Sequence, residues 1–328
     1  MTSIRWREAM SAALYGPDGF FVAGAGPAAH FRTSVHAAPA FTGAVLRLLD
    51  RIDHALDRPD PLQVVDVGAG RGELLTALAG LAPAGLRERL RLTAVELAPR
   101  PPDLPAAIGW QDRLPAPVTG LLVATEWLDN VPLDVADRGA AAPPRYALVD
   151  PATGDESPGT RLDPDDADWL ARWWPGDGRA EIGLPRDLAW RTAVDVLDRG
   201  LALAVDYGHL LADRPPAGTL TGFRHGRQVL PLPDGSCDIT AHVAVDSVAA
   251  AGSAAAGLPY QLLTQRAALR ALGVDGARPP LALAATDPAG YVRSLAAASA
   301  AAELLEPAGL GGHWWLLQPV GVAPILLD

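Results

Sequence analysis

The chain has 328 residues, of which 38 are acidic and 27 are Lys or Arg, so its formal net charge is −11 at pH 7. This length exceeds the common size of a single domain, and we expect a large α/β domain with insertions or with an added lobe. An acidic chain has no global positive field for phosphates, which excludes nucleic acid as a partner. No apolar run reaches the roughly 18 uncharged residues of a membrane-spanning helix.

The first residues and the cysteine content predict a cytoplasmic protein. Residues 1–8 lack the apolar segment of a secretory signal, and Glu8 argues against an organelle transit peptide. The single cysteine, Cys237, excludes an internal disulfide and suits a reducing compartment.

Residues 1–58 are expected to form an N-terminal helical extension and lid. Helical spacing covers residues 4–14, glycines are frequent over 15–26, and a second amphipathic stretch runs from about 36 to 56. Over the expected main domain, 59–328, apolar and helical segments alternate, with strands predicted near 62–67, 90–96, 107–110 and 119–124. This alternation predicts an α/β fold with a doubly wound parallel sheet.

A glycine-rich turn follows the first of these strands. Residues 64–72 read Val-Val-Asp-Val-Gly-Ala-Gly-Arg-Gly. Gly68, Gly70 and Gly72 permit a tight turn and let the backbone approach a ligand that a side chain would displace. The next helix would direct its amides and its positive end at that ligand, and Arg71 lies in the same loop. We therefore predict a nucleotide-cofactor site here, although an ordinary strand, loop and helix is the alternative.

Glu96 ends the second predicted strand, where it can accept hydrogen bonds from the two hydroxyls of a ribose. The dinucleotide fingerprint requires another glycine where Glu73 stands, so the shorter turn favours S-adenosylmethionine (SAM) over NAD. Trp110, Gln111 and Asp112 end the third strand, where the indole could stack on adenine and Asp112 accept from its amino group. Trp110 is equally compatible with a place in the core.

Two insertions are expected in the rest of the chain, around residues 133–185 and 209–305. The first is predicted to hold a hairpin over 135–153 and a surface excursion over 151–178. The second is predicted to hold a strand and helices, followed by a final strand; these elements lie near 218–224, 240–256, 259–272, 288–304 and 313–319.

Between the insertions, a predicted helix at 186–198 leads into the apolar strand 201–205, which ends at Asp206 and Tyr207. Polar residues at this end of a strand lie where open α/β sheets bind ligands. The histidines, among them His209, His225 and His242, match no zinc spacing, so no metal site is expected.

Seven separated motifs occur in an order that a known family shares. They are Met10 with Leu14-Tyr15 and Gly19-Phe20-Phe21; Gly68-Ala69-Gly70-Arg71-Gly72; Val95-Glu96-Leu97-Ala98-Pro99; Thr125-Glu126-Trp127-Leu128-Asp129-Asn130-Val131-Pro132; Asp206-Tyr207-Gly208; Asp238-Ile239-Thr240-Ala241-His242-Val243; and Thr264-Gln265 with Leu272-Gly273. In these motifs the chain resembles the MidA-like SAM-dependent methyltransferases, which include the mitochondrial complex I assembly-factor arginine methyltransferase.

The resemblance implies a Rossmann-like SAM-methyltransferase fold with an N-terminal helical extension and inserted helical and β elements. It implies SAM as cofactor, S-adenosyl-L-homocysteine (SAH) as product, and a protein arginine as methyl acceptor. The implied partner is a protein substrate such as a respiratory complex I subunit, and a homodimer stays open.

The chain departs from the family in the N-terminal lid. The family carries Gly-Asp-Phe-x-Thr-Ser-Pro-Glu, and this chain carries Ala-His-Phe-Arg-Thr-Ser-Val-His over 29–36. Thr33 and Ser34 are kept and are assigned to the cofactor, whereas His30 and His36 replace two acids. A changed substrate or a loss of activity is therefore an open alternative.

Glu126 and Asp129 follow the fourth strand and, with Asp206 and Tyr207, are the candidate catalytic residues. Two carboxylates suit an arginine acceptor because they bind the planar guanidinium through bidentate bonds. The alternative is that Glu126 caps a helix and Asp129 forms a turn. Three functions stay open: a protein arginine methyltransferase, a methyltransferase acting on a small molecule or on another protein atom, and a non-catalytic SAM-binding assembly factor.

Overall fold

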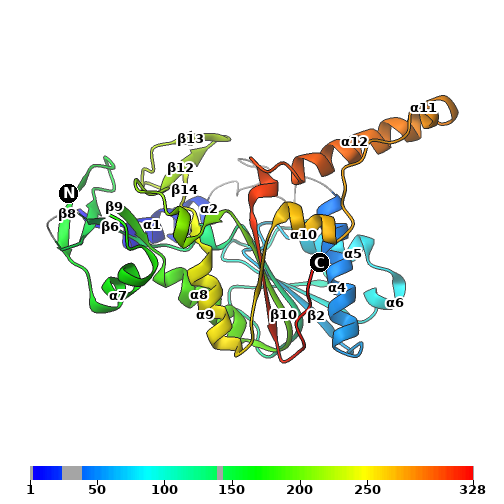
Figure 1. Ribbon diagram of the computed structural model, residues 1–328, viewed down its shortest axis with the longest axis horizontal. Helices are drawn as coiled ribbons and strands as arrows, with labels where there is room; N and C mark the ends of the chain where they lie inside the picture. Colours follow the sequence, from blue (N-terminus) through cyan, green and yellow to red (C-terminus); the bar gives the residue numbers. More distant parts are fainter. Residues whose placement is uncertain (1–2, 24–38, 139–142, 328) are drawn as a thin grey trace.

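A seven-stranded sheet forms the centre of the part of the chain that the computed structural model describes, residues 3–23, 39–138 and 143–327 (Figure 1). Its strands run in the order β16 (Gln261–Thr264), β17 (Trp314–Val320), β10 (Leu197–Asp206), β5 (Val118–Thr125), β2 (Leu62–Val67), β3 (Leu90–Val95) and β4 (Ile108–Gln111). Strands β10, β5, β2, β3 and β4 are parallel. Strand order reverses between β2 and β5, and open α/β sheets bind ligands at such a switch point.

The sheet is mixed rather than purely parallel, because β17 runs antiparallel to both β10 and β16. The predicted helix over 259–272 is therefore wrong in its first part: residues 261–264 are β16, and the helix α10 covers Gln265–Ala271. The side chain of Thr264 caps α10 by accepting from the amide of Ala267. Pairing with β17, which lies far along the chain, decides the conformation of β16. The local sequence pattern does not indicate this pairing.

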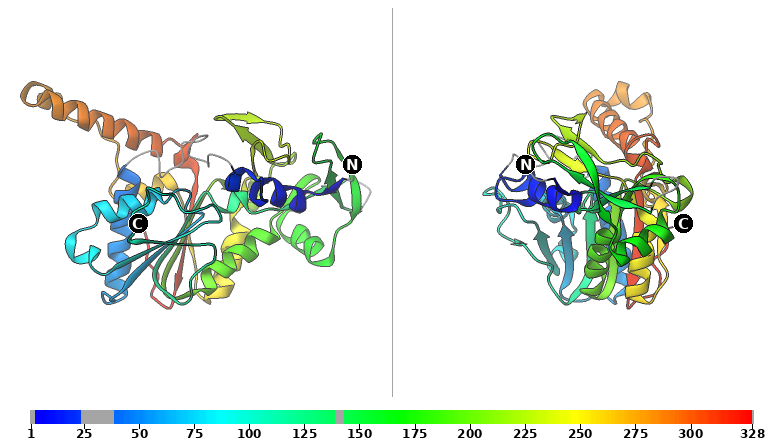
Figure 2. Two further views of the ribbon diagram at one scale, coloured as in Figure 1. Left: turned by 180° about the vertical axis from the view of Figure 1, so that it is seen from behind. Right: turned by 90° about the vertical axis from the view of Figure 1, so that its left-hand side faces the viewer.

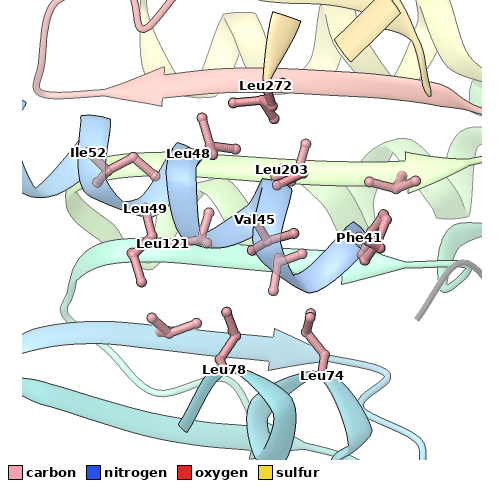
Figure 3. Packing of buried hydrophobic residues seen from close by; sticks show 14 of the residues in the cluster. Phe41, Val45, Leu48, Leu49, Ile52, Leu74, Leu78, Leu121, Leu203 and Leu272 are labelled. Carbon is pink, nitrogen blue, oxygen red and sulfur yellow. The ribbon is translucent and has the colours of Figure 1, made fainter. Parts of the chain in front are cut away.

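Helices cover both faces of the sheet, as the doubly wound prediction required. On one face, α4 (Pro39–Ala55), α5 (Glu73–Leu81) and α10 share an apolar core with the strands. Figure 3 shows Val45 and Leu48 of α4 facing Leu121 of β5 and Leu203 of β10. On the other face lie α8 (Leu184–Asp195) and α9 (Val245–Ala256) (Figure 1).

The sequence pattern explains this two-sided burial. Successive side chains of a strand point to opposite faces, so Leu203 enters the α4 core while Ala202 and Ala204 enter the α8 and α9 core. Strands of a parallel sheet that is covered on both faces read as continuous apolar runs, as β10 does. Strand β10 begins at Leu197, so the predicted helix over 186–198 ends earlier, at Asp195.

A second sheet lies beside the first (Figure 2). It contains β1 (Ile4–Arg5), β7 (Arg145–Val149), β6 (Asp134–Arg138), β9 (Gly178–Ile182) and β8 (Glu156–Arg161). The surface excursion predicted over 151–178 is wrong, because it contains β8 and the helix α7 (Pro164–Trp173), and buries Trp169, Leu170 and Trp174. Helix α1 (Trp6–Tyr15) packs Trp6 and Ala9 against this sheet.

Small elements complete the chain. The strands β13 (Arg227–Val229), β12 (Thr221–Arg224) and β14 (Asp238–Thr240) form a third sheet, and β11 (Gly208–His209) pairs with β15 (Val243–Ala244). The helix predicted over 240–256 therefore begins only at Val245. The remaining elements are α2 (Phe20–Ala23), α6 (Ala84–Arg87), α11 (Ala282–Thr286), α12 (Pro288–Leu304) and the 3-10 helices η2 (Leu128–Asn130), η3 (Leu211–Asp213) and η4 (Leu310–Gly312). None of the helices in the described ranges has the length and hydropathy of a bilayer span.

Leu48 tests how much the core under α4 stabilises the fold. Its side chain is 0% exposed, so Leu48→Ala should lower the free energy of unfolding by about 2–5 kcal/mol through lost burial and a cavity. Leu230→Ala is the control, because Leu230 is 87% exposed and should change stability by less than about 0.5 kcal/mol. Urea unfolding followed by circular dichroism measures both, and equal losses would contradict this account of the core.

Candidate functional site

A cleft of about 1070 Å³ lies at the carboxyl ends of the parallel strands. Its floor comes from residues that follow β2, β3, β5 and β10, which end at the same edge of the sheet. Its walls come from α1, the third sheet and η4, through Tyr15, Phe223, Thr240 and His313 among others. The cleft is therefore where the strand-end prediction located a ligand site.

The glycine-rich loop has the backbone that its sequence requires. Gly68, Gly70 and Gly72 have φ of +69°, +60° and +80°, which residues other than glycine adopt only with strain. A Cβ on Gly68 would lie 2.9 Å from Trp127 Cδ1, and one on Gly72 would lie 2.6 Å from Leu104 Cδ1. The loop thus packs without side chains against its neighbours while Gly68 and Gly70 line the cleft.

Glu96 connects the end of β3 to this loop. Its Oε2 accepts from the amide of Gly70 at 3.0 Å, and its Oε1 accepts from the amides of Leu97 at 2.7 Å and Ala98 at 3.1 Å. Burial raises the pKa of Glu96, while these three bonds act in the opposite direction. A carboxylate has about four acceptor positions, so capacity remains for a hydroxyl donor in the cleft.

The other predicted cofactor residues divide into two groups. Asp112 and Arg71 line the cleft, and the guanidinium of Arg71 pairs with Asp103 at 3.2 Å. Trp110 and Gln111 are not among the lining residues: the indole of Trp110 donates to the carbonyl of Ala98 at 3.1 Å and packs against the main core. The structure therefore gives Trp110 a place beside the core, and an adenine contact for it or for Gln111 stays a prediction.

Thr33 and Ser34, which were assigned to the cofactor, lie outside the described residues, as do His30 and His36. Sequence reasoning gave no role to Asp66, which is 2% exposed and lines the cleft. Within the described chain its Oδ1 has no hydrogen-bond partner, and burial raises its pKa well above the ordinary value. A buried acceptor that opens on a cleft fits a ligand that donates a hydrogen bond.

Glu126 follows β5 directly and lines the cleft in a strained conformation. Its φ is +50°, in the left-handed region, and its amide donates to the carbonyl of Val205 at 2.8 Å. This bond joins the turn after β5 to the end of β10. Backbone strain of this kind persists where surrounding contacts hold it, and it is frequent at functional sites.

Asp129 lies one turn further on, in η2, and is 3% exposed. Its Oδ2 accepts from the hydroxyl of Tyr207 and from Thr240 Oγ1, the latter at 2.7 Å. Its Oδ1 has no hydrogen-bond partner in the described part of the chain. Burial raises the pKa of Asp129, and the two hydroxyl bonds oppose that rise. The structure thus brings the side chains of Asp129 and Tyr207 together, and their catalytic roles stay a prediction.

Asp206, predicted as a catalytic residue, does not line the cleft. Its Oδ2 accepts from the amides of Leu128 and Asp129 at 3.0 and 3.2 Å, and its Oδ1 accepts from the amide of Tyr207 at 2.9 Å. The carboxylate of Asp206 therefore holds the turn that carries Asp129. Its position supports a structural contribution to the site rather than contact with a substrate.

Asp238 adds a third carboxyl group to this end of the cleft. It lies on β14, is 6% exposed, and its Oδ1 accepts from the side-chain amide of Asn130 at 2.7 Å. Burial and the nearby Asp129 carboxylate raise the pKa of Asp238 to about 8. The Asp238-to-Val243 motif gave the only sequence signal for this residue, and sequence reasoning assigned it no role.

Aromatic and imidazole rings surround the carboxylates. The ring of Tyr207 lies 5.1 Å from that of His242 and 5.5 Å from that of His313, between ring centroids. Burial lowers the pKa of His242, and lowers that of His313 to about 4, so these imidazoles are neutral at pH 7. Across the ranges that the structure describes, no group of three or more His, Cys, Asp or Glu is arranged to hold a metal ion.

Comparison with protein families decides the assignment. The sequence model of a family described as "Putative S-adenosyl-L-methionine-dependent methyltransferase" matches residues 49–264, well over half of the chain. The chain belongs to this family. A search of curated protein sequences finds no match.

Two solved structures from Burkholderia thailandensis are similar over almost the whole chain. One, bound to S-adenosyl-homocysteine, is 25% identical, covers 99% of this chain and 89% of its own, and has a TM-score of 0.80. The other, a native structure, is also 25% identical, with coverages of 98% and 88% and a TM-score of 0.75. These matches confirm the Rossmann-like fold and the prediction of SAM rather than NAD as the cofactor.

The glycine-rich loop provides a direct test of the cofactor site. Gly70→Val should abolish SAH binding, because a β-branched residue at φ +60° is strained and its side chain would fill the space that a ligand needs. Glu96→Ala should weaken binding by about 1–3 kcal/mol, since it removes a charged acceptor. Calorimetry measures both. The control is Asp195→Asn, at an acid of α8 that is 52% exposed and does not line the cleft, and an equal loss there would count against the assignment.

The raised pKa of Asp238 predicts how stability depends on pH. The folded protein keeps this proton up to about pH 8 whereas the unfolded chain loses it near pH 3.8, so the folded state loses stability relative to the unfolded state as pH rises between these values. Asp238→Asn, which resembles the protonated form, lacks this loss. Urea midpoints should be similar at low pH, and wild type should be the less stable protein at pH 8 and above. A pH-independent difference would refute the shift.

Proposed function

We propose that this SAM-dependent methyltransferase methylates the guanidinium group of a protein arginine. The observation that carries the proposal is the set of three carboxyl groups, of Glu126, Asp129 and Asp238, that line one end of the cleft. Carboxylates bind a planar guanidinium through paired, charge-assisted hydrogen bonds. A cation bound there would stabilise the ionised form of these groups, including Asp238 with its raised pKa, so the site favours a cation over a neutral or anionic substrate.

Asp129 Oδ1, which has no partner among the residues that the structure describes, supports the proposal independently. Both hydroxyls that contact this carboxylate, those of Tyr207 and Thr240, bond to Oδ2. A buried acceptor without a donor lowers stability by about 1–3 kcal/mol. An N–H group of a bound substrate would satisfy Oδ1, so the arrangement favours a donor-rich acceptor such as guanidinium.

The chain's own groups can also manage the proton. The cofactor supplies an electrophilic methyl group on a sulfonium. When a guanidinium nitrogen forms its bond to this methyl, the sulfur keeps the electrons of the broken bond and the nitrogen must lose a proton. The end of the cleft lined by Glu126, Asp129 and Asp238 is called the acceptor end. There the carboxylate of Glu126 or Asp129 would take that proton and hold the nitrogen in line with the methyl group.

The proposed partner is a protein that presents an arginine side chain, and a respiratory complex I subunit is the candidate that the family resemblance implies. Incubating the purified protein with methyl-labelled SAM and a lysate of cells that lack it identifies the acceptor. We expect a labelled protein whose hydrolysate contains methylarginine. A labelled small molecule would instead support the second function left open by the sequence, and a label on another residue type would refute arginine.

Charge removal at the acceptor end tests the roles of Glu126 and Asp129. Glu126→Gln and Asp129→Asn keep the side-chain volume, so SAM affinity should stay within about 2-fold of wild type while methyl transfer falls by about 100-fold or more. Asp195→Asn is the matched control, since this acid lies on α8, pairs with Arg191 and is half exposed. Labelled-methyl incorporation measures the rates, and unchanged rates in both variants would refute the proposal.

A further inference from the structure

Arg186 is a fully buried arginine directly behind the acceptor end of the cleft. It lies in the first turn of α8 and is 1% exposed. A guanidinium in such a position loses its hydration. This loss is unfavourable unless its N–H donors are satisfied by other hydrogen bonds. The bonds that satisfy it therefore indicate what it holds together.

The donors of Arg186 reach two segments that are distant in sequence. Nη2 donates to the carbonyl of Asp129, and Nε donates to that of Val131 at 3.2 Å. Nη1 donates to the carbonyls of Ala241 and His242 at 2.8 and 3.1 Å. The first pair belongs to the turn after β5, and the second pair to the loop after β14.

Both segments contribute residues to the lining of the cleft. The first carries Asp129, and the second follows Thr240, whose hydroxyl donates to the Asp129 carboxylate. Other bonds join the two segments in pairs: the amide of Ala241 donates to the carbonyl of Asp129 at the long distance of 3.3 Å, and the side chain of Asn130 donates to Asp238 and Ile239. Arg186 alone contacts four of their carbonyl groups.

We propose that Arg186 is a positioning residue for methyl transfer: its guanidinium fixes the turn that carries Asp129 against the loop that follows Thr240 and carries His242. The inference rests on the proposed function, because it assumes that the acceptor binds at Asp129. Only the planar, forked guanidinium can reach both segments at once, whereas a lysine ammonium is a single point of donors. Arg186 does not line the cleft, so it would act through the two segments and not by contact with the substrate.

The same guanidinium supplies a fixed positive charge to the site. Asp129, Asp206, Glu181 and the hydroxyl of Tyr207 favour its charged form. In turn its charge lowers the pKa of the nearby titratable groups Tyr15, His209 and His242. The positive charge of Arg186 lowers the pKa of both Asp129 and Asp206, against the larger effect of burial. A lysine at this position would keep the charge and lose the bridge, which separates the two contributions.

Arg186→Lys is therefore the decisive variant, and Arg214→Lys is its matched control. Arg214 is also buried, with 6% of its side chain exposed, and it also donates to main-chain carbonyls, those of Trp173 and His209. It does not line the cleft or contact the acceptor end. Thermal unfolding of both variants shows whether their losses of stability match.

We expect Arg186→Lys to lower kcat by at least about 10-fold, since small displacements of a catalytic group are costly, while the Kd for SAH stays within about 2-fold. Arg214→Lys should leave kcat within about 2-fold of wild type. The rate is measured with the acceptor that becomes labelled in the lysate experiment. The test therefore stays valid even if that acceptor is not an arginine. A kcat for Arg186→Lys equal to wild type, or lowered only as much as that of Arg214→Lys, overturns the proposal.

Amide hydrogen exchange gives a readout that needs no acceptor. The amide of Ala241 joins the two segments, so it should exchange faster in Arg186→Lys than in wild type, while the amide of Leu203 in β10 stays unchanged. Unchanged exchange at Ala241 overturns the proposal. If Arg186→Lys does not accumulate as folded protein, Thr240→Val and Thr240→Ser replace it: loss of activity only in the valine variant supports the need for this link, and equal activities overturn it.

Discussion

The parallel pairing of β5 with β2 on one side and with β10 on the other is the constraint on which the rest of the structure depends. It brings the carboxyl ends of the three strands to one edge, so the residues that follow them meet there. Gly68, Glu126 and Asp206 follow these strands or end them. A one-residue shift of register would turn each strand's core side chains to the other face, so the apolar cores on both faces also fix the site.

Local sequence patterns made part of the fold and of the candidate site predictable. Long-range contacts decided the remaining elements and side-chain positions. The loop of Gly68 and the β2 strand could be predicted, because glycine spacing and an apolar run are local signals. The β16 strand could not, since its conformation depends on pairing with β17. The α7 helix had local signals that the predicted surface excursion overlooked: Pro164 at its start and two acids in its first turn. Asp206 illustrates the limit for side chains: sequence placed it correctly at a strand end, but only the structure shows that its carboxylate binds amides rather than the cleft.

The acceptor end concentrates buried ionisable groups where a fold optimised for stability would place apolar side chains. Asp129, Asp206 and Asp238 are each less than 7% exposed, and Arg186 is the buried cation that faces this group. Such groups destabilise a fold unless hydrogen bonds compensate for lost hydration. Here amides, hydroxyls and carbonyls bond to much of this group, but within the described ranges Asp129 Oδ1 has no partner, which links a residual cost to the place where a substrate would bind.

The bonds that close the cleft span long stretches of sequence, which has a consequence for biosynthesis. Tyr15 donates to the carbonyl of Asn130, and Asn130 in turn donates to Asp238, so the N-terminal helix is connected to the acceptor end through residues made much later. On the ribosome, the β2 loop is complete long before β14 and β17 emerge. Until then, helix α1 lacks β14 and the edge of β10 lacks β17. Such unpaired apolar surfaces and strand edges are prone to aggregation, and chaperones protect them.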